Sequence, residues 1–259
     1  MNDYSYEHLK YLRKIKRRNI LILISRLSLI VFFLSIWELS AKLGFINTFL
    51  YSSPSMVIKT FVNLLMNGEL LNHLSITLFE LLISFLLSII LGIIIATILW
   101  SCDFIQKVFD PFITVLNSLP KVALGPLIII WFGASPKSII FMSLLISIFI
   151  TIINVYQGFY STDKNYITMI KSFEATKWQI FRYVVFPSNF DNIISTLKIN
   201  ISMNLIGIIM GELLVSKKGI GYLIMYGSQV FNIDLVITCV FILGIISYIM
   251  YSIVNKISR

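Results

Sequence analysis

The sequence has few of the residues that most catalytic and metal sites require. Its 259 residues include two cysteines, Cys102 and Cys239, and two histidines, His8 and His73. Two cysteines are too few for a disulfide framework, and both lie in or beside apolar segments, where a thiol behaves as a small apolar group. Two separated histidines offer no His/Cys metal cluster. We therefore expect neither a disulfide scaffold nor a bound metal.

A phosphate-binding loop of the G-x-x-x-x-G-K-[ST] type is missing as well. Any nucleotide chemistry must then belong to another chain, and we expect no cofactor in this one. No histidine lies where it would activate a serine inside an apolar run, and no apolar run carries two acids at helical spacing. These gaps argue against an intramembrane hydrolase or another membrane-bound enzyme.

Charged residues are scarce, at 13% of the chain, whereas hydrophobic residues make up 58% and aromatic residues 14%. Several apolar runs are long enough to cross about 30 Å of hydrocarbon, which indicates an all-α integral membrane protein. The hydropathy pattern predicts six transmembrane helices, at 20–43, 76–100, 109–132, 138–155, 193–215 and 235–254. The first run is too long for a cleaved signal peptide and should remain as a signal anchor.

The basic residues predict the orientation of these spans. A basic tail at 1–19 precedes a transmembrane domain at 20–259, and its cations are Lys10, Arg13, Lys14, Lys16, Arg17 and Arg18. With six spans, the loop at about 158–187 and the C-terminus lie on the same side as this tail, and we expect all three to be cytoplasmic. The opposite side receives fewer cations, Lys59, Lys137, Lys217 and Lys218. The net charge of +9 thus concerns membrane topology, and no nucleic-acid partner is expected.

One segment between two apolar runs differs from the rest. Residues 163–187 read DKNYITMIKSFEATKWQIFRYVVFP and are rich in Lys and Arg. Their apolar side chains fall near one helical face, at Ile167, Ile170, Trp178, Phe181 and Val185. Glu174 is the one charge on this stripe. The pattern predicts a basic amphipathic helix, which either lies on lipid headgroups or contacts a protein partner.

The predicted span at 109–132 contains Pro120 and Pro126, with Lys121 between them. A helix broken there must recover its backbone hydrogen bonds from neighbouring helices, a cavity or a local tightening of the turn. Interrupted spans can line a transport path, and simple packing kinks are at least as common, so both interpretations stay open.

The acidic residues in or near the spans form a second set of candidates. Gly207 and Gly211 are a small-xxx-small pattern, which favours packing within one subunit over a dimer contact. Glu212, directly after them, either gates or lines a path, caps local backbone, or pairs with Lys217 or Lys218.

Two further acids, Glu38 and Glu80, are expected to differ in whether they have an ion-pair partner. Glu38 and Lys42 lie one helical turn apart and are expected to form a pair. Glu80 has no local partner, which favours an interior or pore-facing position. Pro54, behind two serines, is predicted to begin a short amphipathic helix that ends near Gly68.

Several motifs together resemble the permease subunits of bacterial ATP-binding-cassette importers, and especially their nitrate, sulfonate and taurine branch. The motifs are FEATKWQIFRYVVFP, NSLPKVALGPLIIIWFGASPKS, WELSAKLG, SSPSMV and GELLVSKKGIGYLI. The resemblance runs from Trp37 to the C-terminus. The chain departs from it at several positions: the family glycine of the cytoplasmic loop falls at Glu174, its leading glutamate at Thr168, and a frequent basic residue of the second span at Glu80. Met169 and Ile170 occupy the positions of the small residues that follow that glutamate.

The resemblance implies that the 158–187 loop forms a coupling helix seated on a cytoplasmic ATPase, which binds the ATP. The implied contacts are Phe173, Glu174, Ala175, Thr176 and Trp178, with Ile167 and Ile170 packing toward the membrane core. The expected assembly is a homodimer in lipid, with two ATPase chains and an external substrate-binding protein. The expected solute is small and polar or anionic.

The residues expected to line or gate its path are Asn117, Ser118, Pro120, Pro126, Ser202, Asn204 and Glu212. The alternative is that their polar groups only satisfy local backbone or neighbouring helices. A self-sufficient channel or secondary carrier is the rival hypothesis for function.

Overall fold

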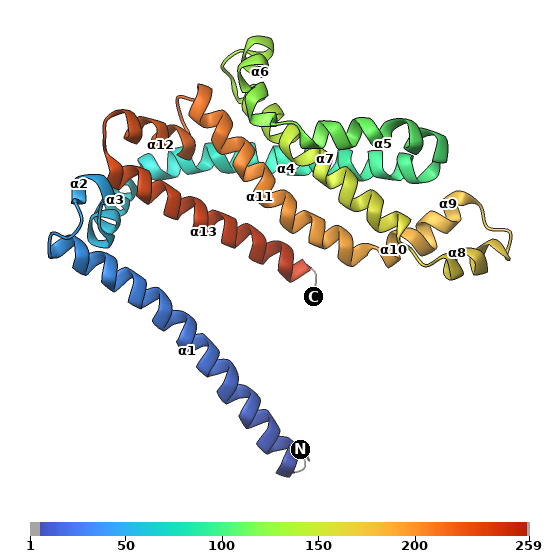
Figure 1. The fold of residues 1–259 in the computed structure, drawn as a ribbon, viewed down its shortest axis with the longest axis horizontal. Coiled ribbons are helices and arrows are strands. Elements are labelled where there is room, and N and C mark those ends of the chain that lie inside the picture. Colours follow the sequence, from blue (N-terminus) through green and yellow to red (C-terminus); the bar gives the residue numbers. More distant parts are fainter. Residues whose placement is uncertain (1–5, 258–259) are drawn as a thin grey trace.

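The computed structural model describes residues 6–257, which form helices joined by short connections (Figure 1). The N-terminal half contains α1 (Tyr6–Lys42), α2 (Thr48–Tyr51), α3 (Pro54–Met66), α4 (Glu69–Ser101), α5 (Asp103–Ser118), a 3-10 turn (Lys121–Leu124) and α6 (Gly125–Phe132). The remainder contains α7 (Pro136–Tyr160), α8 (Lys164–Lys171), α9 (Lys177–Ile180), a π-helical turn (Phe181–Val185), α10 (Phe186–Ser188), α11 (Phe190–Val215), α12 (Ile220–Gln229) and α13 (Ile233–Ile257). The predicted all-α class is confirmed.

Among the described residues, the helices long and apolar enough to cross a membrane are α1, α4, α7, α11 and α13. A sixth span is formed if α5 and the Lys121–Phe132 stretch are counted together, although these two are bent by 85°. Several helices extend beyond their predicted bounds. Helix α4 begins at Glu69 rather than at 76, directly after Gly68, whose positive φ of 73° separates it from α3.

The break in the sixth span follows from its prolines. Leu119 precedes Pro120 and has extended backbone angles, as the clash with a following proline ring requires. Lys121 donates from Nζ to the backbone oxygen of Asn117 at 2.7 Å and so satisfies one of the free carbonyls at the end of α5. Pro126 lies in the first turn of α6, where its missing N–H has no cost. The predicted break at this point is confirmed.

The core of the bundle is made by α4, α7 and α11, which cross one another in the centre of Figure 1. Glycines lie where the helix backbones meet. A Cβ added at Gly207 of α11 would come within 2.4 Å of the Cα atom of Ser143 on α7, and one at Gly92 of α4 within 2.5 Å of Thr151 Cγ2. Gly211 similarly faces Ile139. The small-xxx-small pattern therefore packs helices within one subunit, as the sequence favoured.

Polar side chains connect the same three helices. Asn204 Oδ1 accepts hydrogen bonds from Ser143 at 2.9 Å and from Ser147 at 3.2 Å, both on α7. Ser88 of α4 donates to Asn200 Oδ1 at 2.9 Å, and Asn200 donates to Thr151. All of these side chains are buried. Because apolar surroundings provide no other partner for such groups, their bonds fix how the three helices lie against one another.

The ends of the bundle differ in what they carry. In Figure 1, α2, α3 and α12 lie together at the end where α4 and α13 begin, while α8, α9 and α10 lie at the end where α7 passes into α11. Helix α3 begins at Pro54 behind the cap Ser53, as predicted. The expected pair of Glu38 and Lys42 is also formed, at 3.1 Å.

Candidate functional site

Residues 163–187, the connecting segment, are not the single amphipathic helix that the sequence predicts. Helix α8 ends at Lys171, and Glu174 then adopts a positive φ of 57°, which turns the chain away from the helix axis. A new helix begins at Lys177, capped by Thr176, whose hydroxyl accepts from the backbone N–H of Gln179 while the Gln179 side chain accepts from the Thr176 N–H. This capping box starts α9 and explains the interruption.

The turn between α8 and α9 is an exposed tip. Phe173 is 78% exposed and Trp178 is 63% exposed, and Glu174 and Thr176 are exposed beside them. Ala175 is half-buried and packs against the apolar cluster beneath. The five residues implied as ATPase contacts therefore lie together, with two large aromatic side chains mostly exposed.

Aromatic contacts join this tip to the bundle. Trp178 stacks on Phe181, with 5.7 Å between ring centroids, and Phe181 is buried. Phe181 in turn contacts Trp100 at the end of α4, at 5.4 Å, and Phe159 at the end of α7, at 5.3 Å. Ile167 and Ile170 pack against the same cluster. A displacement of Trp178 would thus reach two core helices through one buried ring.

The polar residues expected along a path lie in different places. Asn204 is fully buried within the α4–α7–α11 interface, where it satisfies neighbouring helices. Ser118 bonds to the carbonyl of Val115 in its own helix, and Asn117 accepts from Lys121. Ser202 is exposed on α11. Pro120 and Pro126 flank the bend between α5 and α6.

Glu212 caps backbone, which was one of its three interpretations. Its Oε2 accepts from the N–H of Gly221 at 2.6 Å, and its Oε1 accepts from the Thr77 hydroxyl at 2.7 Å. Thr77 also accepts from the N–H of Ile220 at 2.8 Å. Gly219 has a φ of 107°, and a Cβ there would lie 2.3 Å from Glu212 Oε1. The carboxylate and Thr77 together hold the start of α12 against α4.

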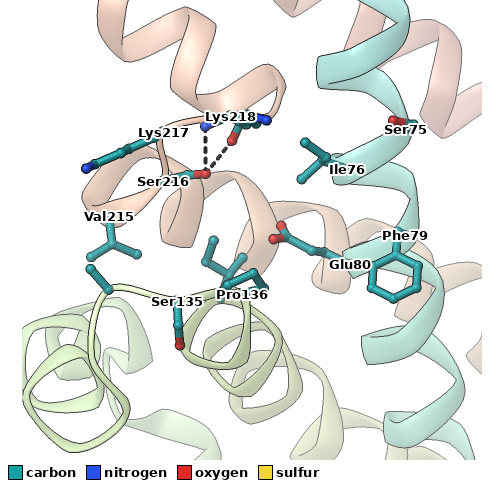
Figure 2. Close-up of a pocket in the computed structure, with 12 residues that line it drawn as sticks. Ser75, Ile76, Phe79, Glu80, Ser135, Pro136, Val215, Ser216, Lys217 and Lys218 are labelled. Carbon is teal, nitrogen blue, oxygen red and sulfur yellow. Dashed lines mark hydrogen bonds between the residues drawn. The ribbon is translucent and has the colours of Figure 1, made fainter.

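Glu80 lies beside Glu212 but has a different environment. It is 1% exposed, and its Oε2 atom makes no hydrogen bond to any described residue. Figure 2 shows its carboxylate pointing into a space between α4, the loop before α7 and the loop after α11. This space, the Glu80 cavity, has a volume of about 690 Å³, and its other lining residues include Ile76, Phe79, Pro136, Ser216 and Lys218.

The family profile described as the binding-protein-dependent transport system inner membrane component matches residues 88–259. The chain belongs to this family. The permease protein SsuC of Bacillus subtilis, named for aliphatic sulfonates transport, is 27% identical over 226 residues, which cover 87% of this chain and 82% of SsuC. ThiX of Halalkalibacterium halodurans, a formylaminopyrimidine transport permease protein, is 28% identical over 86% of this chain and 89% of ThiX.

The fold agrees with this membership. A chain of a bacterial ABC transporter involved in the import of the acidic polysaccharide alginate superposes with a TM-score of 0.67, at 16% identity, over 96% of this chain and 98% of that one. The protein is therefore a multi-pass membrane permease subunit of an ABC importer and not an enzyme.

The polar contacts that hold the core together are absent from the residues predicted from the sequence. Thr77, Ser84 and Ser88 of α4 recur at intervals of seven and four, and Ser143, Ser147 and Thr151 of α7 at intervals of four. Such spacing places each set on one helical face, so the pattern was available as a signal of interhelical bonding.

Proposed function

We propose that this permease moves a small polar solute inward across the cytoplasmic membrane, driven by ATP hydrolysis on separate ATPase chains that dock on the exposed tip of the connecting segment. An external substrate-binding protein would deliver the solute. Two copies of the chain would form the path between them, with lipid around the apolar helices. Family membership supports the ATPase and binding-protein partners.

The contact between Trp178 and Phe181 is the observation that carries this proposal. Phe173 and Trp178, exposed on a capped turn, fit a groove on a soluble partner. Buried Phe181 offers a rigid route from that groove to α4 and α7. Lys177 adds a second link, because its Nζ donates to the carbonyl of Ser101 at 3.4 Å. Transmission of this kind requires that the ATPase bind two arrangements of the bundle with different affinity.

Replacement of Trp178 with aspartate tests the docking. An aspartate removes the aromatic anchor and places a charge in the contact, so we expect the ATPase no longer to copurify while the chain still inserts. The matched control is Phe45→Asp, at a residue that is 80% exposed in the connection between α1 and α2, at the other end of the bundle. Copurification of the Trp178→Asp variant at the unmodified level would contradict the docking site.

The proposed topology has its own test. Single cysteines at Lys177 and at Lys217 are introduced into a chain that lacks Cys102 and Cys239, and intact cells are treated with an impermeant thiol reagent. With the N- and C-termini in the cytoplasm, the cysteine at 217 reacts from outside and the one at 177 does not. Reversed labelling would overturn the orientation.

A further inference from the structure

The Glu80 cavity contains a buried carboxyl group that no cation of the described residues neutralises. Within the described residues, Glu80 takes part in no ion pair, and its buried Oε2 has no donor. A buried polar atom without a partner is costly, and a carboxylate more so. Glu212 is the neighbouring acid, and its oxygens accept from Thr77 and Gly221, so it offers Glu80 no donor unless the two carboxyl groups share a proton. Two adjacent carboxyl groups that share one proton still leave one negative charge beside the cavity.

The two lysines of the cavity do not serve as ion-pair partners of Glu80. Lys217 and Lys218 are exposed at its rim, and Figure 2 shows the Lys217 ammonium group pointing away from Glu80. Water and salt screen exposed ammonium groups strongly, whereas the carboxylate of Glu80 is screened much less. The deep part of the cavity is therefore negative, although its rim is positive.

We propose that the Glu80 cavity binds the protonated amine of a small solute, with Glu80 as the residue that contacts it. The inference rests on the proposed function and narrows its substrate class to solutes that carry an ammonium group. An ammonium group supplies three donors and a compact positive charge, which match a carboxyl group that lines the cavity and that no described cation neutralises. A volume of about 690 Å³ lies within the range of small-molecule sites.

Ile76 provides a position for a reporter. It lines the cavity one helical turn before Glu80, and Figure 2 shows its side chain pointing into the same space. The reporter is Ile76→Cys in a full-length chain that carries Cys102→Ser and Cys239→Ala. Its rate of modification is measured with two methanethiosulfonates of similar size, one ending in trimethylammonium and the other in sulfonate. Each rate is repeated with ethylammonium or ethanesulfonate as competitor, at matched ionic strength.

We expect the cationic reagent to react faster and ethylammonium, but not ethanesulfonate, to slow modification. Glu80→Gln keeps the shape of the side chain and removes its charge. The ratio of the cationic to the anionic modification rate should then fall at least about tenfold. This is the effect of one charge about 6 Å from the reporter at an effective dielectric constant near 40. In the Glu80→Gln variant, protection by ethylammonium should also vanish. Glu69→Gln, which removes an exposed carboxylate from the same helix, should change neither result.

Two outcomes would overturn the proposal. Absence of ethylammonium protection in the parent would mean that the two carboxyl groups only share a proton between them. Protection that persists in Glu80→Gln would place the amine elsewhere. An uncharged thiol reagent that reacts equally with all variants verifies the fold. None of these readouts needs an ATPase, so the inference can fail while the docking proposal holds.

Discussion

The core of the bundle and the tip of the connecting segment each contain a position that favours glycine, but only the core has a glycine there. In the core, Gly207 lies where α11 meets α7, and any side chain there would collide with the backbone at Ser143. At the tip, Glu174 has a φ of 57°, a conformation that favours glycine, yet a glutamate occupies it. Glycine is thus present at 207, where two backbones touch, and absent at 174, where only the local conformation favours it.

This difference reflects the size of the two penalties. A collision with backbone cannot be relieved unless two helices separate, which would also break the hydrogen bonds around Asn204. A left-handed glutamate costs on the order of 1 kcal/mol, and nothing else must move. Position 207 in the core therefore tolerates little change, while position 174 at the tip can accept other residues without moving a helix.

The largest expected effect tests the contact in the core. Gly207→Leu should destabilise the protein by about 3 kcal/mol, because the new side chain forces α11 away from Ser143. Titration of the purified chain with SDS in mixed micelles measures this loss. Gly244→Leu on α13 is the control, since a Cβ there meets no atom within 4 Å. Equal losses in the two variants would show that backbone contact is not what sets the core apart.

A smaller loss is expected from the polar contacts. Asn204→Leu removes the acceptor of Ser143 and Ser147 and should cost about 1–2 kcal/mol in the same titration. Ser101→Ala serves as the control, because this exposed hydroxyl bonds only to a carbonyl of its own helix. If Asn204→Leu were as stable as the parent, the hydrogen bonds would contribute nothing beyond packing.

The smallest effect is a gain at the tip. Glu174→Gly should stabilise the turn between α8 and α9 by about 0.5–1 kcal/mol, because glycine adopts a positive φ without strain. Hydrogen exchange of the amides in 164–180 should slow about two- to fivefold. Glu174→Ala should bring no such gain, since alanine keeps the Cβ. Equal protection in both variants would mean that the backbone at 174 is not strained.

Much of the fold could be predicted, because its signals are local. Long apolar runs predict the spans, and Pro120 predicts the break, since a proline ring forbids a continuous helix whatever surrounds it. The pair of Glu38 and Lys42 also depends on spacing within one helix. These features need no knowledge of which helices are neighbours.

The remaining features depend on contacts between distant segments. Apolar periodicity continues through residues 163–187 and gives no sign of the turn at Glu174, although the family glycine at this position was a usable clue. The role of Glu212 depends on Thr77, which lies 135 residues away. The burial of Asn204 likewise follows from Ser143 and Ser147 on another helix. A single sequence without aligned relatives does not reveal such pairs.

Helix α1, unlike the core helices, makes few contacts with the rest of the subunit. No part of its apolar window is buried, and its contacts lie in its last turns, where Trp37 stacks on Phe241 and Glu38 accepts from the N–H of Ser55. Most of α1 thus needs to be apolar but need not match any neighbouring surface in this subunit. During evolution its sequence can drift, or be exchanged for another apolar helix of the same orientation, without disturbing the core that the later helices build.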